Sequence, residues 1–366
     1  MDIIKRFINE NKMMSMLIGG ILGIILLLVI IFGIAGCVGG RKITYEELEI
    51  KMIEATHNYY KDNEAELPKE EGSEVSITLE MLIEREYLKP LEDLVEGSCS
   101  GNVVLKNNGG RYATYPTLTC GTEYSTSKLY PILISNIVTS GDGLYEYENE
   151  YVYRGEYVNN TVSFGNTLWR VVSINKQGNI RLVKADSESR VYRFDDRYNN
   201  ESQKSTGISV FATSRLRESL DTYYTVIEKG FTEDDLGHLI AHDVCVSARS
   251  RDNLAIDKNV DCSEVYKNQH ISVPYVSEYF RASIDPNCTA IDKDICTNYN
   301  YFSNEVGNVL TANRNTANTY EVYTTNYTPV EARLSSTISL VVELDQKEVF
   351  SGGSGTKADP YVLVIK

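Results

Sequence analysis

The sequence predicts an α+β protein with one N-terminal transmembrane helix, a small module of helices and antiparallel strands, and a larger β-rich C-terminal domain. Three observations carry this prediction. Residues 13–40 contain no charged side chain, residues 44–87 contain two stretches with helical spacing of apolar residues, and short strand patterns separated by turns follow from residue 99 onward. The expected organisation is a cytoplasmic tail at 1–12, the apolar segment at 13–40, a first module at 41–122, a connector at 123–140 and a C-terminal surface domain at 141–366.

The apolar segment 13–40 is long enough to cross a hydrocarbon core of about 30 Å as one tilted helix. Lys5, Arg6 and Lys12 precede it, which favours a cytoplasmic N-terminus and places the rest of the chain outside the cell. A second interpretation stays open, because Ile34-Ala35-Gly36-Cys37 resembles the lipobox at which bacterial lipoproteins are cut and Cys37 would be acylated. Either anchor makes the lipid bilayer an expected partner and the cell membrane the expected location.

The first module is expected to start with a helix and to contain a disulfide-closed hairpin. Thr44 and Glu47 form a capping-box pattern ahead of a helical stretch to residue 60, and Thr78 precedes a second helical stretch over 79–87. A turn sequence at 107–110 separates two strand patterns flanked by Cys99 and Cys120. This order of elements resembles type IV pilins and pseudopilins over about residues 40–122, although no Glu lies in the apolar run as a processed prepilin leader requires.

Six cysteines follow Cys37, an even number in a compartment that permits disulfides. Their order favours three local pairs, although other connectivities stay open. The six are Cys99, Cys120, Cys245, Cys262, Cys288 and Cys296. No C-x-x-C motif occurs, so neither redox catalysis nor a structural zinc is expected, and no cofactor is predicted.

The C-terminal domain is expected to be mostly sheet. Strand patterns cover 151–153, 162–174 and 180–183, an amphipathic helix is expected over 214–228, and Trp169 is expected to anchor the core. The segments LWRVV (168–172), EYFRAS (278–283) and GTKADPY (355–361) resemble a widespread uncharacterised domain of bacterial surface proteins over about 141–366. The resemblance implies a fold similar to C-type lectins. It implies no activity, and the calcium signature of those lectins is missing.

Two groups of polar residues are candidate metal sites. His238 and His242 are four residues apart and would share one face of a helix, where they could begin a zinc site, but Leu239 stands where metalloproteases have Glu. The preferred interpretation is two polar helix residues near an outer surface. An acidic group without EF-hand spacing is interpreted as a solvated loop. It comprises Asp252, Asn253, Asp257 and Asp261.

The composition argues against a nucleic-acid partner. The chain has 51 acidic and 36 basic residues and a formal net charge of −15, and no local cluster of Lys and Arg stands out. The many Tyr, Asn and Thr residues suit contacts with an extracellular protein or glycan. Candidate ligand-binding residues lie in the stretch 298–327, and the alternative is that its rings pack inward. They are Tyr320, Tyr323, Asn326 and Tyr327.

The sequence therefore predicts a non-enzymatic, membrane-anchored extracellular surface protein whose C-terminal domain serves adhesion or ligand binding on a pilin-like stalk. Two alternatives stay open. One is a structural, pseudopilin-like subunit of a secretion or pilus machine. The other is an extracellular hydrolase whose catalytic residues converge only in three dimensions.

Overall fold

The computed structural model describes residues 42–147, 149–198, 200–201, 204, 206–226 and 230–365. Its mixture of sheets with few, mostly short helices confirms the α+β class. None of the helices in these residues is both long and apolar enough to cross a bilayer. The predicted tail at 1–12, the apolar segment 13–40 and the lipobox with Cys37 lie outside the described residues.

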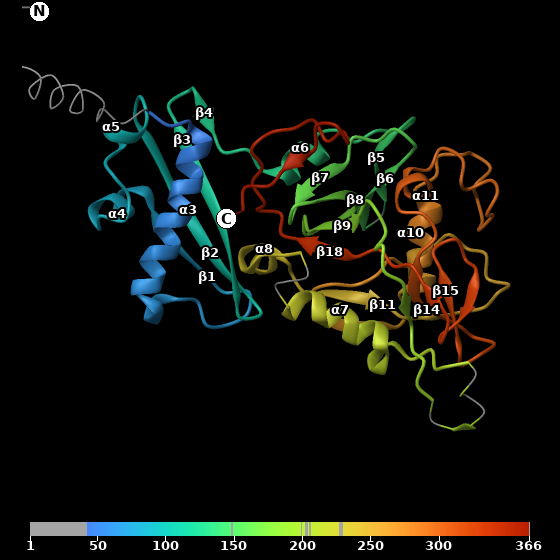
Figure 1. Ribbon diagram of the computed structural model, residues 1–366. Helices are drawn as coiled ribbons and strands as arrows, with labels where there is room; N and C mark the ends of the chain where they lie inside the picture. Colours follow the sequence, from blue (N-terminus) through green and yellow to red (C-terminus); the bar gives the residue numbers. More distant parts are fainter. Residues whose placement is uncertain are drawn as a thin grey trace, which may run out of the picture.

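The first module packs helix α3 (Tyr45–Asp62) on a four-stranded antiparallel sheet (Figure 1). The strands lie in the order β1 (Glu74–Thr78), β2 (Cys99–Asn108), β3 (Arg111–Cys120) and β4 (Tyr124–Ser125). Three short helical segments complete the module, η1 (Glu64–Glu66), α4 (Leu79–Glu84) and α5 (Leu91–Leu94). Leu48, Met52 and Tyr59 form the buried stripe of α3 against the sheet, as the helical spacing predicts.

Helix α3 begins at the expected capping box. The Thr44 hydroxyl accepts a hydrogen bond from the Glu47 backbone N–H at 3.2 Å, and the Glu47 carboxylate accepts one from the Thr44 N–H at 2.9 Å. Residues 42–44 have no helical structure, and Thr44 is extended with φ −74° and ψ 165°. The helix therefore starts at Tyr45 and does not continue from residues 42–44.

The C-terminal domain is built on a seven-stranded sheet. Its main path runs β18 (Val341–Leu344), β9 (Ile180–Lys184), β8 (Thr167–Asn175), β6 (Glu150–Arg154) and β5 (Gly143–Tyr147). Strand β7 (Thr161–Phe164) pairs with β8, and β19 (Tyr361–Val362) joins β7 in parallel. Trp169 of β8 is fully buried and its indole N–H donates to the Phe164 carbonyl at 2.9 Å, so the expected core anchor is confirmed.

Smaller sheets and short helices cover this core. A second sheet has the order β12 (Ala248–Arg249), β14 (Leu310–Asn315), β15 (Glu321–Thr324) and β16 (Pro329–Glu331). Two ribbons pair β10 (Tyr192–Arg193) with β17 (Ser335–Ser336) and β11 (His242–Cys245) with β13 (Val265–Gln269). The helical segments are α6 (Leu129–Ile134), η3 (Phe211–Thr213), α7 (Arg215–Thr225), α8 (Glu233–His238), α9 (Lys258–Asp261), α10 (Val276–Arg281) and α11 (Tyr301–Glu305).

The two parts contact each other through the β2–β3 hairpin, which lies against α8 (Figure 1). Gly237 of α8 approaches so closely that a Cβ there would lie 2.3 Å from the Tyr112 carbonyl oxygen. The Asn108 side-chain amide donates to the Gly237 carbonyl at 2.9 Å, and both groups are buried. On the other side of the junction, Ile53 of α3 packs on Val349 and Val364 near the C-terminus. The first module is therefore packed directly onto the C-terminal domain.

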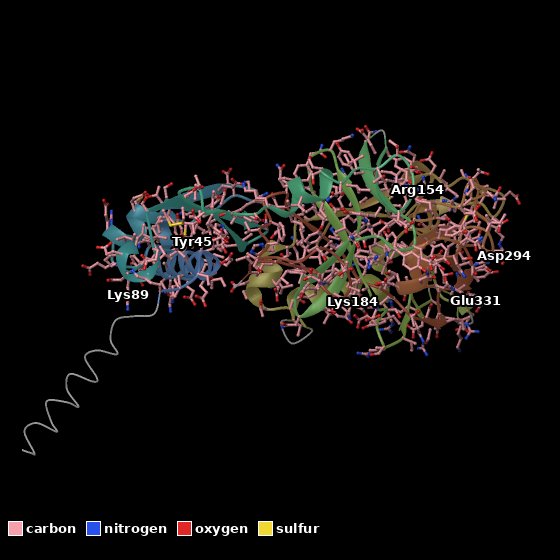
Figure 2. The ribbon with its side chains drawn as sticks, turned by 90° about the horizontal axis from the view of Figure 1, so that it is seen from above. Tyr45, Lys89, Arg154, Lys184, Asp294 and Glu331 are labelled. Carbon is pink, nitrogen blue, oxygen red and sulfur yellow. A yellow bond between two sulfur atoms is a disulfide. The ribbon has the colours of Figure 1, made fainter. Side chains whose placement is uncertain are left out.

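The predicted connector 123–140 is not a free linker. Its first residues form β4 and complete the sheet of the first module, whereas Leu129 and Leu133 of α6 are fully buried in the C-terminal core. Seen from above, the molecule is elongated, with Tyr45 and Lys89 at one end and Asp294 and Glu331 at the other (Figure 2). The described chain therefore starts at the end of the molecule that lies away from Asp294 and Glu331 (Figure 2).

Candidate functional site

Two of the four residues predicted as a recognition face in the stretch 298–327 are buried. Tyr323 is fully buried and Tyr327 is 7% exposed, and their rings stack with centroids 4.4 Å apart. The Tyr323 hydroxyl donates to the Arg249 carbonyl at 3.2 Å, and the Tyr327 hydroxyl donates to the Ser250 carbonyl. The prediction is wrong for both residues, because sheet pairing and these hydrogen bonds make the rings part of the interior.

The other two predicted residues are only partly accessible. Tyr320 is half-buried at the turn before β15, and Asn326 is half-buried in the next turn. The Asn326 side-chain oxygen accepts hydrogen bonds from the hydroxyls of Thr324 and Thr328 at 3.0 and 2.8 Å. Asn326 therefore has a local structural role that accounts for its position.

His238 and His242 do not share a helix face, because α8 ends at His238 and the next residue is extended. Both imidazoles are buried, which corrects the expected outer-surface position. His238 Nδ1 lies 3.0 Å from both carboxylate oxygens of Glu348, whereas His242 Nε2 lies 2.7 Å from the Ser272 hydroxyl. Within the described ranges, no three His, Cys, Asp or Glu side chains are grouped so that they could hold a metal ion.

The two histidines also differ in their electrostatics. Burial by itself lowers the pKa of His238, but the attraction of the adjacent Glu348 carboxylate outweighs it and the net pKa is raised. Burial raises the pKa of Glu348 because it disfavours the charged carboxylate. His242 has no comparable partner, and burial lowers its pKa to about 4. The ring of Tyr115 in β3 contacts the His238 ring edge-on, with their centroids 5.2 Å apart. The His238–Glu348 pair therefore lies at the contact between the two parts of the protein.

The four residues of the acidic group 252–261 differ in their exposure to solvent. Asp252, Asn253 and Asp257 are exposed, as expected for a solvated loop. Asp261 is fully buried instead and forms an ion pair with the equally buried Arg249 at 2.5 Å. The expectation is therefore wrong for Asp261, whose carboxylate also accepts a hydrogen bond from the Ser277 backbone N–H at 2.7 Å.

The charged residues of the segment EYFRAS (278–283), one of those that resemble a bacterial surface domain, form buried ion pairs within the fold. Glu278 accepts hydrogen bonds from Arg181 of β9 at 2.5 Å and from the Tyr275 N–H at 3.0 Å, and so joins α10 to the main sheet. Arg281 pairs with Glu150 of β6 at 2.6 Å. These buried pairs give the charged side chains of core helix α10 partners within the fold.

The six cysteines form the three local disulfides that their order favours. Cys99 pairs with Cys120 across the ends of β2 and β3, Cys245 with Cys262, and Cys288 with Cys296. In the first pair the two cysteines are also direct partners in the strand register.

A groove lined by arginines lies between the β10–β17 ribbon and helix α7, with a volume of about 490 Å³. Arg190, Arg193 and Arg215 line it together with Asp196. Arg193 is placed by strand pairing, since it lies opposite Ser335 of β17. Arg215 is placed by the helix start, since the Ser214 hydroxyl caps α7 by accepting a hydrogen bond from the Arg217 N–H at 3.1 Å.

Asp196 holds two of these arginines in position. Its carboxylate accepts a hydrogen bond from Arg193 at 2.8 Å and another from the Nε of Arg215. Burial alone would raise the pKa of Asp196, but the hydrogen bonds from both arginines lower it, so the carboxylate is ionised at neutral pH. Both arginine side chains remain 53% exposed. Each guanidinium group is therefore held by Asp196 on one side and exposed to solvent on the other.

Phenol and hydroxyl groups form the remainder of the groove. The hydroxyls of Tyr192 and Tyr223 lie 2.7 Å apart, and Tyr223 donates to Glu188 at 3.0 Å, which fixes both rings. The guanidinium of Arg190 lies 5.9 Å from the centre of the Tyr192 ring. The groove also exposes the hydroxyl side chains of Ser219, Thr222 and Ser335. With three arginines against one aspartate, the lining carries a formal charge of +2 in a chain of net charge −15.

This site was missed in the sequence because its parts are separated along the chain. The ribbon partner Ser335 lies more than 100 residues after α7, so no local pattern joins them. A partial signal existed, since five arginines fall within residues 190–217 despite the acidic composition. The structure brings three of these five, Arg190, Arg193 and Arg215, together in the groove.

Comparison with family models, with curated proteins and with solved structures finds no match for this chain. The resemblances to pilins and to the bacterial surface domain therefore stay predictions.

Proposed function

We propose that this chain is a membrane-anchored extracellular recognition protein, in which the module 42–125 carries a C-terminal ligand-binding domain. The observation that carries the proposal is the arginine groove, an open basic surface on an acidic chain. Exposed, pre-oriented guanidinium groups are suited to bind anionic groups of a ligand.

The extracellular part of the proposal is supported by the disulfides and by the apolar segment. Three disulfides are typical of a protein that folds in an oxidising compartment. The uncharged run 13–40 offers an anchor, and the described chain begins at one end of an elongated molecule (Figure 2).

The two alternatives receive less support. A pseudopilin-like subunit would have a helix continuing from the membrane segment, whereas α3 starts at its own capping box. A hydrolase would be favoured by carboxylates grouped with His238 and His242 around one pocket, whereas each histidine is buried against a different partner.

Surface exposure and binding can be tested on whole cells. The full chain is produced in a bacterial host, intact cells are treated with a protease, and the cells are then screened against arrayed glycans and extracellular proteins. We expect proteolysis of the chain without cell lysis, and binding that is absent from cells without the chain. Protection of the chain in intact cells, with digestion only after lysis, would refute the extracellular location. Exposure without any binding across both arrays would refute recognition.

A further inference from the structure

We propose that the arginine groove binds an acidic sugar, a pyranose that carries one carboxylate, with Arg193 and Arg215 holding the carboxylate. This inference rests on the proposed recognition function and names the ligand of the groove. It is argued from the charge, the size and the polar lining of the site.

The charge of the groove fits a carboxylate. Asp196 occupies one side of Arg193 and Arg215, using one terminal nitrogen of the first and the Nε of the second. The remaining guanidinium N–H groups are available on two half-exposed side chains, and guanidinium matches a carboxylate with paired hydrogen bonds. Arg193, Arg215 and Asp196 together carry a formal charge of +1, which a single carboxylate would neutralise.

The size and lining fit a sugar ring. A volume of about 490 Å³ lies in the range of small-ligand sites, roughly 300–1,000 Å³. Ser219 and Thr222 donate their hydroxyl protons to carbonyls of their own helix at 2.9 Å, which leaves their oxygens able to accept hydrogen bonds from sugar hydroxyls. The fixed ring of Tyr192 offers a flat apolar surface of the kind that the C–H face of a pyranose contacts.

Arg190 adds a second contact. Among the described residues it forms no ion pair, and its guanidinium lies beside the Tyr192 ring rather than against a carboxylate. It is therefore free to bind a second acidic unit or a hydroxyl at the edge of the groove. A chain of acidic sugars would then bind more strongly than a single unit.

The test uses the full chain, purified in mild detergent, with ligand binding followed by saturation-transfer NMR and calorimetry. The probes are N-acetylneuraminic acid, glucuronic acid, glucose and inorganic phosphate. We expect both acidic sugars to bind and glucose and phosphate to bind at least tenfold more weakly. The double variant Arg193→Gln/Arg215→Gln should weaken acidic-sugar binding at least tenfold, since hydrogen bonds to charged groups are the strong ones.

The matched control is Arg251→Gln, which removes an arginine that is 54% exposed and paired with Glu321 outside the groove. It should leave sugar binding unchanged, and both variants should keep the thermal midpoint of the parent because the altered side chains are exposed. Phosphate binding equal to that of the acidic sugars would overturn the sugar assignment. Unchanged acidic-sugar binding in the double variant, or no binding of either acidic sugar, would overturn the groove as the site. Array binding that survives the double variant would still support the recognition function on another face.

Discussion

Gly237→Ala is the sharpest test of the contact between the two parts of the protein. The new Cβ would lie 2.3 Å from the Tyr112 carbonyl oxygen, whereas ordinary contacts begin near 3.4 Å. The position of the Cβ is fixed by its own backbone and the Tyr112 oxygen is a backbone atom, so no side-chain rotation can relieve the overlap. The variant must therefore move α8 away from β3 by about 1 Å.

The expected cost follows from what that movement breaks. Separation stretches the buried hydrogen bond from Asn108 to the Gly237 carbonyl, now 2.9 Å, and an unpaired buried amide costs about 1–3 kcal/mol. Overpacking lowers the free energy of unfolding by a further amount of about 1–3 kcal/mol, whereas the higher helix propensity of Ala raises it by about 1 kcal/mol. We expect the free energy of unfolding to fall by about 3 kcal/mol.

Urea unfolding of the full chain measures this change. The fluorescence of Trp169, the only Trp, reports the C-terminal core, and far-UV circular dichroism reports both parts. Glu233→Gln is the control on the same helix, because it removes only an exposed ion pair with Arg111 and should cost less than about 1 kcal/mol. A Gly237→Ala variant no less stable than this control would refute the close contact between α8 and β3.

Three further predictions concern buried charges and a disulfide. The pKa of His238 is raised in the folded state, so its pairing with Glu348 stabilises the protein fully below the unfolded pKa of about 6.5. This contribution to the free energy of unfolding is lost as the pH rises through the folded pKa. Glu348→Gln should therefore cost more stability at pH 6 than at pH 8, measured by urea unfolding. Asp261→Ala should cost about 3–5 kcal/mol in the same assay, since it leaves a fully buried arginine unpaired. Replacing Cys99 and Cys120 by Ser should cost about 3 kcal/mol, because the closed loop has a sequence separation of 21, and Trp169 fluorescence and circular dichroism should shift together.

Each of these predictions has a result that contradicts it. A pH-independent effect of Glu348→Gln would mean that His238 is neutral in the folded protein at pH 6. Arg251→Gln removes an exposed ion pair and should cost less than about 1 kcal/mol. An equally small cost for Asp261→Ala would refute the prediction that the buried pair with Arg249 contributes more to stability than an exposed pair. Separate transitions after loss of the disulfide would show that the two parts unfold independently.

The features that could be predicted from the sequence are local ones. The capping box at Thr44, the hairpin between Cys99 and Cys120 and the three disulfide pairs depend on residues close in the chain, and all are present. The helix expected over 214–228 is present as Arg215–Thr225, because the serine cap before it and the apolar spacing within it are also local.

The features that failed depend on contacts between distant segments. Tyr323 was expected at a surface because its neighbours are polar, but its ring is buried by pairing of β15 with β14 and β16. His238 is buried by Tyr115 and Glu348, more than 100 residues away in either direction. The arginine groove likewise needs β17 beside β10. Spacing along the chain contains none of this information.

The disulfides also set how far the molecule can be stretched. When a chain held near Tyr45 is pulled at the opposite end, segments can unravel only until a covalent bond bears the tension. The three bridges close loops with sequence separations of 21, 17 and 8, which withholds on the order of 160 Å of contour length at about 3.5 Å per residue. Reduction would release that length, so a pulling experiment would record a longer tether with the bonds opened than with them closed.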